Sequence, residues 1–396
     1  MDGLRGFAIL WVLCYHTWLF SWYTPALHAF GRDVPVDVLP RVGYLGVELF
    51  FLISGFCLFV PYARSAVLGV DSGVPLRAFA WRRAVKIVPS YVLALLVTVP
   101  FALPYVHGAG PIGWALANHL AFVHNFFDDA FGKANSVFWG LAIEVQFYLI
   151  FPALALVFKR APLVATVTMI ALALAYRHAL AGCCLLQEAV MRQLPAYLDV
   201  FACGMFAAYA VTWLHARRIH GTRARLLATL AACAAAGLTF LLLETCSAVQ
   251  YTPKGRETWD LLGRTELALL FSAFVIASCF ALRFWRGAIA NPVLVFLSLV
   301  SYNVYLWHTL ILIWMWKHGV PRAATPNPHD DDHWKFVYIA SGWIVVFAVA
   351  TAVTYFIERP LLATIKPHAF ACDWRGLWRR LSVRARPSIA TRETRT

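Results

Sequence analysis

Charged residues are scarce in this chain. Only 14% of its 396 residues are Asp, Glu, Lys or Arg, whereas a soluble domain carries about 25%. The nine cysteines show no spacing typical of a metal site, since most of them lie singly within apolar stretches. No internal repeat is evident, so an inverted-repeat transporter gains no support from that test. The low charge excludes an ordinary soluble domain.

Apolar residues take the place of the missing charges, at 61% of the chain, and the mean hydropathy is +0.66. This composition predicts an all-α polytopic membrane protein in which one bundle uses nearly the whole length. Runs of about 20 apolar residues mark about ten transmembrane helices. The expected spans are 6–24, 43–63, 86–106, 138–158, 162–181, 195–214, 226–244, 265–283, 291–316 and 335–357.

The net charge of +14 is typical of some nucleic-acid-binding proteins, but its distribution favours a membrane topology. With the N-terminus in the cytoplasm, about two thirds of the Lys and Arg residues fall in cytoplasmic segments, as the positive-inside rule requires. We therefore expect an N-in and C-in bundle over residues 1–360 and no nucleic-acid partner. Residues 361–396 form a basic tail, expected to be cytoplasmic, first interfacial and then disordered. No cleavable signal peptide is expected, because the first apolar run contains Arg5 and His16.

The first span carries two ionisable side chains whose spacing places them on one helix face. Arg5 and His16 are eleven positions apart, which turns a helix to roughly 20° beyond three full turns. The two side chains therefore share one helix face, about 16 Å apart along the axis. An ionisable residue facing mid-membrane is costly, which indicates function. The alternative is a histidine that hydrogen-bonds a neighbouring helix and only holds the bundle together.

A basic cluster precedes the third span. It contains Arg82, Arg83 and Lys86, of which Arg83 and Lys86 share a helix face. Cations beside the membrane suit a phosphate-bearing ligand, with arginine as a bidentate donor and lysine as a point charge. The alternative is an ordinary positive-inside loop.

The fourth span carries Glu144 about two turns into an apolar helix. A carboxylate there needs a partner or a proton. It could pair with Arg5, hold the imidazole of His16 or bind a substrate hydroxyl. In the second span, the small residues Ser54 and Gly55 favour close helix packing rather than catalysis.

The ninth span carries Ser301, Tyr305 and His308 on one helix face. Such a polar face lines either a helix contact or a cavity, and the cavity is the slightly favoured interpretation. Residues 330–333 read Asp-Asp-Asp-His, a pattern more typical of an acidic surface turn than of a metal site. No metal is expected.

Taken in order, these stretches resemble the membrane-bound acyltransferase family 3, the bacterial O-acyltransferases that modify sugars and envelope polysaccharides. Lys86 stands where the family has a second arginine, which keeps the charge and loses the fork geometry. The resemblance covers nearly the whole chain. The stretches that carry it are Asp2-Gly3-Leu4-Arg5-Gly6 with His16, Gly46 to Gly55, Arg82 to Pro89, Trp139 to Pro152 and Ser301 to His308.

The resemblance implies a ten-helix core in the bacterial inner membrane and an acyl-CoA donor, expected to be acetyl-CoA, on the cytoplasmic side. It also implies a hydroxyl acceptor on a sugar of an envelope polysaccharide or glycolipid, and no permanently bound cofactor. The residues expected to act are His16, Arg5 and Glu144 in catalysis, Arg82, Arg83 and Lys86 at the donor, and Ser301, Tyr302, Tyr305, His308 and Tyr148 at the acceptor.

Two other functions stay open on the sequence. A transporter of a sugar- or lipid-linked substrate would also need many spans and buried ionisable groups, and it would move its substrate without acyl-CoA. A non-enzymatic scaffold would use the polar side chains only to join helices, and it would tolerate His16→Ala.

Overall fold

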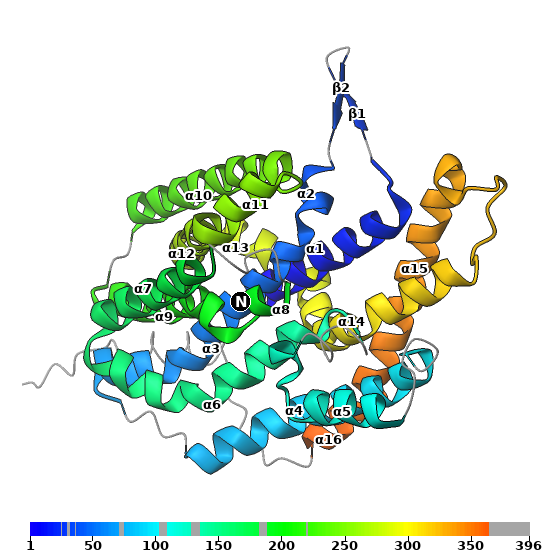
Figure 1. The fold of residues 1–396 in the computed structure, drawn as a ribbon. Coiled ribbons are helices and arrows are strands. Elements are labelled where there is room, and N and C mark those ends of the chain that lie inside the picture. The colour runs from blue at the N-terminus through cyan, green and yellow to red at the C-terminus, as the bar shows by residue number, and fades with distance from the viewer. Residues whose placement is uncertain are drawn as a thin grey trace, which may run out of the picture.

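Helices make up almost all of the computed structural model (Figure 1). The structure describes residues 1–24, 26–29, 32–35, 37–70, 75–102, 109–127, 135–181, 188–218 and 221–363. Within these residues, nine helical segments are long and apolar enough to cross a membrane. They are Gly43–Leu68, Leu76–Pro100, Phe138–Arg160, Pro162–Ala181, Leu194–Ala216, Thr222–Val249, Pro253–Phe280, Arg283–Lys317 and Asp332–Ala363.

These nine segments confirm the all-α membrane class and overlap every expected span after the first. The largest shifts are at the starts of two spans: the helix expected at 86–106 begins at Leu76, and the segment expected at 265–283 begins at Pro253. The N-in and C-in orientation stays a prediction. Of the expected tail at 361–396, residues 364–396 lie outside the described residues.

The α-helices follow the chain in the order shown in Figure 1. They are α1 (Asp2–Ser21), α2 (Val38–Arg41), α3 (Gly46–Leu68), α4 (Leu76–Ala102), α5 (Ala109–Leu120), α6 (Phe138–Arg160), α7 (Pro162–Ala181), α8 (Glu188–Met191), α9 (Leu198–Ala216), α10 (Thr222–Val249), α11 (Pro253–Thr258), α12 (Arg264–Phe280), α13 (Arg283–Ile289), α14 (Pro292–Lys317), α15 (Asp332–Val353) and α16 (Arg359–Ala363). Short 3₁₀ or π turns are η1 (Gly43–Leu45), η3 (His124–Phe126), η4 (Leu194–Tyr197), η5 (Trp259–Gly263), η6 (Pro328–Asp330) and η7 (Thr354–Glu358).

Helix α1 differs from the nine apolar segments, and its start at Asp2 corrects the expected span of 6–24. Its 20 residues would measure about 30 Å, enough for a membrane, but Arg5 and His16 lower its hydropathy. The helix packs closely against α14 and the end of α13. Gly3 and Gly6 face the backbone there so tightly that an added Cβ would overlap it. This close approach brings the polar face of α1 against α14.

Helix α3 packs against α9 in the interior of the bundle. Gly55 and Gly204 each face the backbone of the partner helix, where an added Cβ would overlap it. Phe51 and Phe201 stack beside this contact with ring centroids 5.0 Å apart. Small residues at helix contacts let two backbones approach in a membrane, so the predicted packing role of Gly55 is supported.

One β-hairpin lies between α1 and α2 and projects from the helices (Figure 1). Strands β1 (Ala26–Ala29) and β2 (Arg32–Pro35) pair antiparallel. The all-α prediction did not include this hairpin. It is a local pairing outside the bundle and leaves the helical class unchanged.

Candidate functional site

Two cavities lie inside the described part of the bundle and share two wall residues, Val47 and Tyr305. The smaller cavity measures about 100 Å³ and lies at the Arg5 end of α1. The larger cavity measures about 410 Å³ and lies at the His16 end. The two ionisable residues of α1 therefore face two adjoining cavities.

His16 in the larger cavity pairs with His308, and the surrounding carbonyl groups fix where the protons lie. His308 Nδ1 is 3.0 Å from the Val304 carbonyl oxygen and 2.9 Å from that of Tyr305, so this nitrogen carries a proton and donates it. In a neutral ring, His308 Nε2 is then an acceptor, and it lies 3.1 Å from His16 Nδ1. His16 Nδ1 therefore carries a proton, which also faces the Val12 carbonyl oxygen at 3.0 Å.

This arrangement leaves the lone pair of His16 on Nε2. Because His16 lines the larger cavity, Nε2 is the ring nitrogen that can meet a ligand there as a base or a nucleophile. The pair also joins α1 to α14, so the helix-joining interpretation of His16 is supported, and the chemical role stays a prediction that this geometry allows.

Three cations line the smaller cavity: Arg5, Arg83 and Lys86. Lys86 forms an ion pair with Glu358 at the end of η7, and its Nζ lies 5.4 Å from the centroid of the Tyr302 ring. Its side chain keeps 32% of its surface exposed. Part of the basic cluster therefore lines a cavity that a ligand can reach, which favours a binding role over an ordinary positive-inside loop.

Arg82 lies elsewhere. Neither cavity is lined by it, although Arg83 beside it lines the smaller one. Successive helical side chains point about 100° apart, and here Arg83 faces the smaller cavity while Arg82 faces away from it. Its predicted contact with the donor gains no support from this geometry.

Glu144 lies in the smaller cavity together with Arg5. Its Oε1 accepts hydrogen bonds from Ser54 Oγ at 2.6 Å and from the Tyr148 hydroxyl at 2.5 Å. Among the described contacts, the partner of His16 is His308 rather than Glu144. Glu144 and Tyr148, which the resemblance assigned to catalysis and to the acceptor, thus lie among the cations.

The polar face of α14 lines a cavity, as the favoured interpretation proposed. Ser301 and Tyr302 line the smaller cavity, while Tyr305 borders both. The Tyr302 hydroxyl donates to the Ile87 carbonyl oxygen at 2.7 Å, and the Tyr305 hydroxyl donates to that of Val137 at 2.5 Å. Of the residues expected at the acceptor, Tyr148 also lines the smaller cavity, while His308 lines neither and meets His16 instead.

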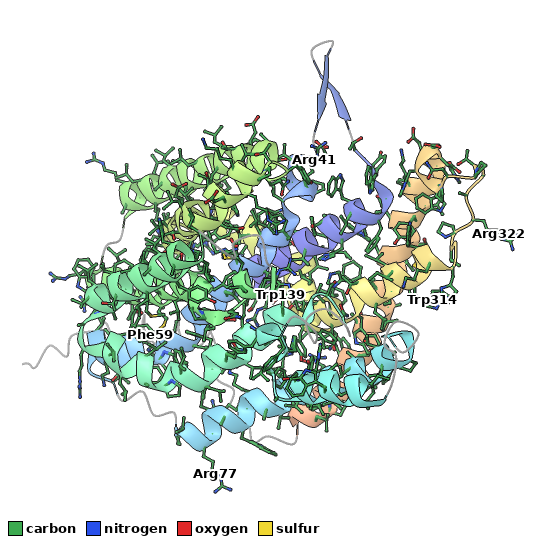
Figure 2. All side chains as sticks on the ribbon, viewed as in Figure 1. Arg41, Phe59, Arg77, Trp139, Trp314 and Arg322 are labelled. Atoms are coloured by element: carbon green, nitrogen blue, oxygen red, sulfur yellow. The ribbon has the colours of Figure 1, made fainter. Side chains whose placement is uncertain are left out.

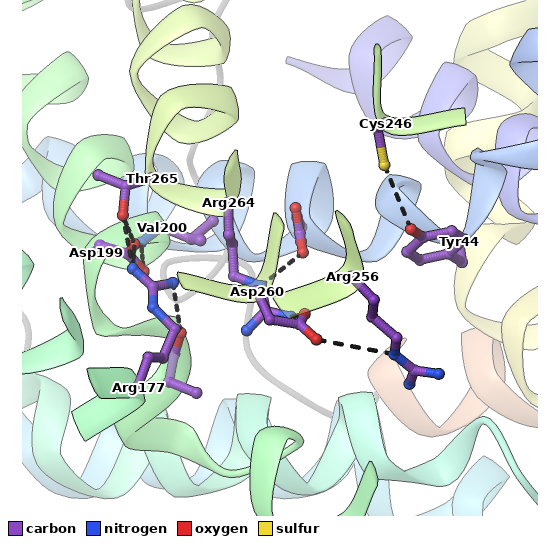
Figure 3. Close-up of polar contacts among 11 residues, drawn as sticks. Tyr44, Arg177, Asp199, Val200, Cys246, Arg256, Asp260, Arg264 and Thr265 are labelled. Atoms are coloured by element: carbon purple, nitrogen blue, oxygen red, sulfur yellow. Dashed lines mark hydrogen bonds and ion pairs between the residues drawn. The ribbon is translucent and has the colours of Figure 1, made fainter. Parts of the chain in front are cut away.

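The larger cavity contains charged residues that the sequence analysis missed (Figure 3). Arg264 Nε donates to Glu48 Oε1 at 2.9 Å, and its Nη2 lies 3.3 Å from Asp260 Oδ1. The signal for Glu48 was present, since a carboxylate near the start of an apolar span needs a partner. Arg264 and Asp260 were overlooked because they precede the expected span at 265–283.

A second buried cluster, also drawn in Figure 3, lines neither cavity. Arg177 Nη2 donates to Asp199 Oδ2 at 2.8 Å, and Thr265 Oγ1 donates to the same oxygen at 2.6 Å. Both charged side chains are fully buried. This cluster joins α7, α9 and α12 and is a structural element.

Arg192, which lines the larger cavity, is supported by the segment of α5 and η3. Its carbonyl oxygen accepts from Asn125 Nδ2 at 2.9 Å, and Asn125 Oδ1 accepts from Gln146 Nε2 at 2.8 Å. In the same segment, His119 and His124 stack with centroids 4.0 Å apart.

Burial lowers the pKa of His119 to about 4. Burial, followed by the neighbouring charge of His119, lowers the pKa of His124 to about 3. Because α5 is not among the nine apolar segments, this stacked pair lies outside them. Both rings are therefore neutral near pH 7.

The fold and the cavities define a polytopic membrane protein in which one residue of a histidine pair lines a mixed-charge cavity that adjoins a cationic one. The model of the acyltransferase 3 family, described as an acyltransferase domain, matches residues 1–359. The chain belongs to this family.

Several curated proteins are similar to the chain. "Putative peptidoglycan O-acetyltransferase YrhL" of Bacillus subtilis is 25% identical over 383 residues, which cover 91% of this chain and 54% of that protein. "Peptidoglycan O-acetyltransferase OatA" of Listeria monocytogenes is 30% identical over 171 residues, covering 40% of this chain and 24% of that protein. A "Putative O-acetyltransferase" of Staphylococcus aureus is 24% identical over 370 residues, covering 81% and 51%. The chain spans about half the length, or less, of these relatives. No solved structure matches it.

Proposed function

We propose that this protein is an integral membrane O-acyltransferase, most simply an O-acetyltransferase, of the bacterial inner membrane. It moves an acyl group from cytoplasmic acyl-CoA to a hydroxyl of a sugar in an envelope polysaccharide or glycolipid. The observation that carries the proposal is the lone pair that the pairing with His308 leaves on Nε2 of His16, a residue that lines a cavity of about 410 Å³. The names of the relatives support an acetyl group and a glycan acceptor.

The smaller cavity suits one part of the donor. Its volume of about 100 Å³ is below the roughly 300–1,000 Å³ of a pocket for a drug-sized ligand, so a slender acyl-bearing arm fits and a nucleotide does not. The nucleotide phosphates would stay at the mouth, where Arg83 and Lys86 supply positive charge. The arm would then reach His16 past the shared wall of Val47 and Tyr305.

His16 supplies the proton chemistry. Its Nε2 takes the proton of the acceptor hydroxyl as the oxygen attacks the thioester carbonyl carbon. The carbon–sulfur bond then breaks, and the thiolate takes the proton back from His16, so an ester and free CoA are formed. His308 Nε2 accepts from His16 Nδ1–H, which orients the ring and stabilises the positive charge that it carries during the step.

The same lone pair could attack the thioester first, so that His16 carries the acyl group before the acceptor takes it. The two routes differ in one observable. The carrier route labels the protein with the acyl group when no acceptor is present, and the base route does not.

The test uses purified protein in nanodiscs with radiolabelled acetyl-CoA. We expect His16→Ala to lower turnover about 10²- to 10⁴-fold and to leave donor binding unchanged. His178→Ala is the matched control, because His178 Nδ1 also contacts the carbonyl oxygen four residues earlier, at 2.8 Å, but lines neither cavity. Full activity of His16→Ala would refute the mechanism. Well-folded protein that binds no acyl-CoA would favour the transporter instead.

A further inference from the structure

Part of the wall of the larger cavity has polar atoms that form no hydrogen bond among the described residues. Three buried atoms there have no hydrogen-bond partner among the described residues: Glu48 Oε2, Arg264 Nη1 and Trp259 Nε1. Their residues are only 5%, 6% and 7% exposed, and all three line the same cavity as His16. Buried polar groups are nearly always paired, so this wall is suited to a polar ligand.

These three atoms differ from most other unpaired buried atoms because their residues line a cavity. Arg177 Nε and Trp307 Nε1 also have no partner in the described part of the chain, but their residues line neither cavity.

Gln250 Nε2 in the larger cavity and Arg83 Nε in the smaller one also have no hydrogen-bond partner among the described residues, but these two residues are only partly buried. In the group of Glu48, Arg264 and Trp259, an unpaired atom on a buried residue coincides with space for a ligand.

The chemistry of the three atoms selects the ligand. A carboxylate oxygen accepts, whereas a guanidinium nitrogen and an indole N–H donate. A hydroxyl group does both. An anion would meet the charge of Glu48 and a cation that of Arg264, and these two side chains already neutralise each other across 2.9 Å. The wall therefore favours a neutral ligand with hydroxyl groups.

Aromatic side chains border the same wall. Arg264 lies over the Tyr197 ring at 4.2 Å from its centroid, and Trp139 lines the cavity near the middle of the molecule (Figure 2). Flat aromatic faces beside hydrogen-bonding groups suit a ring that is apolar on one face and polar at its edges.

We propose that Glu48, Arg264 and Trp259 form a binding subsite for a second, non-reacting hydroxyl of the acceptor. This inference rests on the proposed function and deepens it. The acceptor is a neutral polyol whose one hydroxyl meets His16 while another meets this subsite.

The experiment uses two small probes that enter the cavity whatever the natural acceptor is. Acetyl transfer from acetyl-CoA is measured with ethylene glycol and with ethanol, which differ by one hydroxyl. Wild-type protein in nanodiscs should prefer ethylene glycol by about fivefold or more in kcat/KM, the value of one hydrogen bond.

Two mild variants remove single groups of the subsite. Trp259→Phe removes one donor and keeps an aromatic ring, and Glu48→Gln removes the charge and keeps the shape. Each should lower kcat/KM for ethylene glycol severalfold more than that for ethanol, so that the preference of the wild type is reduced. Trp307→Phe is the control, because it removes an equally buried indole N–H that lines neither cavity.

The outcomes separate the two proposals. No preference in the wild type, or an unchanged preference in both variants, would overturn the subsite. Hydrolysis of acetyl-CoA that depends on His16, without transfer to either alcohol, would also overturn the subsite and leave the proposed chemistry standing. Absence of both transfer and hydrolysis in the wild type would refute the proposed function itself.

Discussion

The two cavities differ in size and in charge although they share a wall. The smaller one, of about 100 Å³, is lined by three cations and one carboxylate, Glu144. The larger one, of about 410 Å³, is lined by three arginines and by the carboxylates Glu48 and Asp260, and it also holds His16. An excess of positive charge favours the phosphate-bearing end of a donor, whereas a nearly balanced wall favours a neutral acceptor. Under the proposed function, the donor would therefore approach through the smaller cavity and the acceptor through the larger one.

Among the variants that compare the two cavities, the largest expected effect is on the donor side. Arg83→Ala removes a cation from the smaller cavity and should weaken acetyl-CoA binding about 10- to 100-fold, because hydrogen bonds to charged groups contribute about 1.5–3 kcal/mol. The KM for the acceptor should not change. Titration of acetyl-CoA into protein in nanodiscs measures the first quantity, and steady-state kinetics measure the second.

Two arginines of the same helix serve as controls for Arg83. Arg77 is exposed and points away from the bundle (Figure 2), so Arg77→Ala should leave acetyl-CoA affinity unchanged. Arg82→Ala decides whether the predicted role of Arg82 survives its position outside the cavity. A loss with Arg82→Ala equal to that with Arg83→Ala would contradict the assignment of the donor to this cavity.

An effect of intermediate size is expected when the pH is lowered, on the stability of the segment of α5 and η3 and on the KM for the acceptor. Burial holds the pKa of His119 at about 4, below its ordinary 6.5, so unfolded chain binds protons that the folded segment does not. The stability of this segment is therefore complete above pH 6.5 and is lost progressively as the pH falls towards 4, by roughly 3 kcal/mol for His119 alone. Because the segment supports Arg192, the KM for the acceptor should rise in this window before that for acetyl-CoA.

Tm measured from pH 7.5 to 4.5, together with both KM values, checks this expectation. Tm should fall by several degrees across the range. His124→Phe keeps a ring for stacking on His119 and removes one titrating group, so its curve should be flatter. An identical pH dependence in this variant would show that other groups are responsible.

The smallest expected effect concerns the wall between the cavities. Tyr305→Phe keeps the ring and removes the hydrogen bond to the Val137 carbonyl oxygen, which should change the KM for both substrates by no more than about fivefold. Tyr338→Phe is the matched control, because its hydroxyl also donates to a buried carbonyl oxygen, that of Leu312 at 2.8 Å, but lines neither cavity. An effect on one substrate alone would contradict a shared wall.

Much of the fold could be predicted because each span is a local property of the chain. Apolar runs of about 20 residues located nine helical segments. The errors fall at polar or short elements: α1 begins at Asp2 rather than at residue 6, α4 begins at Leu76 in its basic stretch rather than at residue 86, and the hairpin of β1 and β2 was not anticipated. Helical periodicity also placed Arg5 and His16 on one face, and they line adjoining cavities.

The candidate site was only partly predictable. The polar face of α14 was recognised, since residues three and four apart must share a side. Arg82 and Arg83 were grouped because they are neighbours in sequence, yet only Arg83 lines the smaller cavity. For Glu144 the sequence suggested three partners, namely Arg5, His16 or a substrate hydroxyl. The hydrogen bonds from Ser54 and Tyr148 that the structure shows were not among them.

The sequence by itself determined the membrane class, the positions of the spans and the helix faces that carry polar groups, because these depend on composition and on a period of about 3.6 residues. Only the tertiary structure decided which polar groups meet. His16 and His308 are 292 positions apart, and Glu48 and Arg264 are 216 apart. Such contacts depend on how helices pack through glycine and aromatic side chains, and local periodicity carries no information about which helix will be the neighbour.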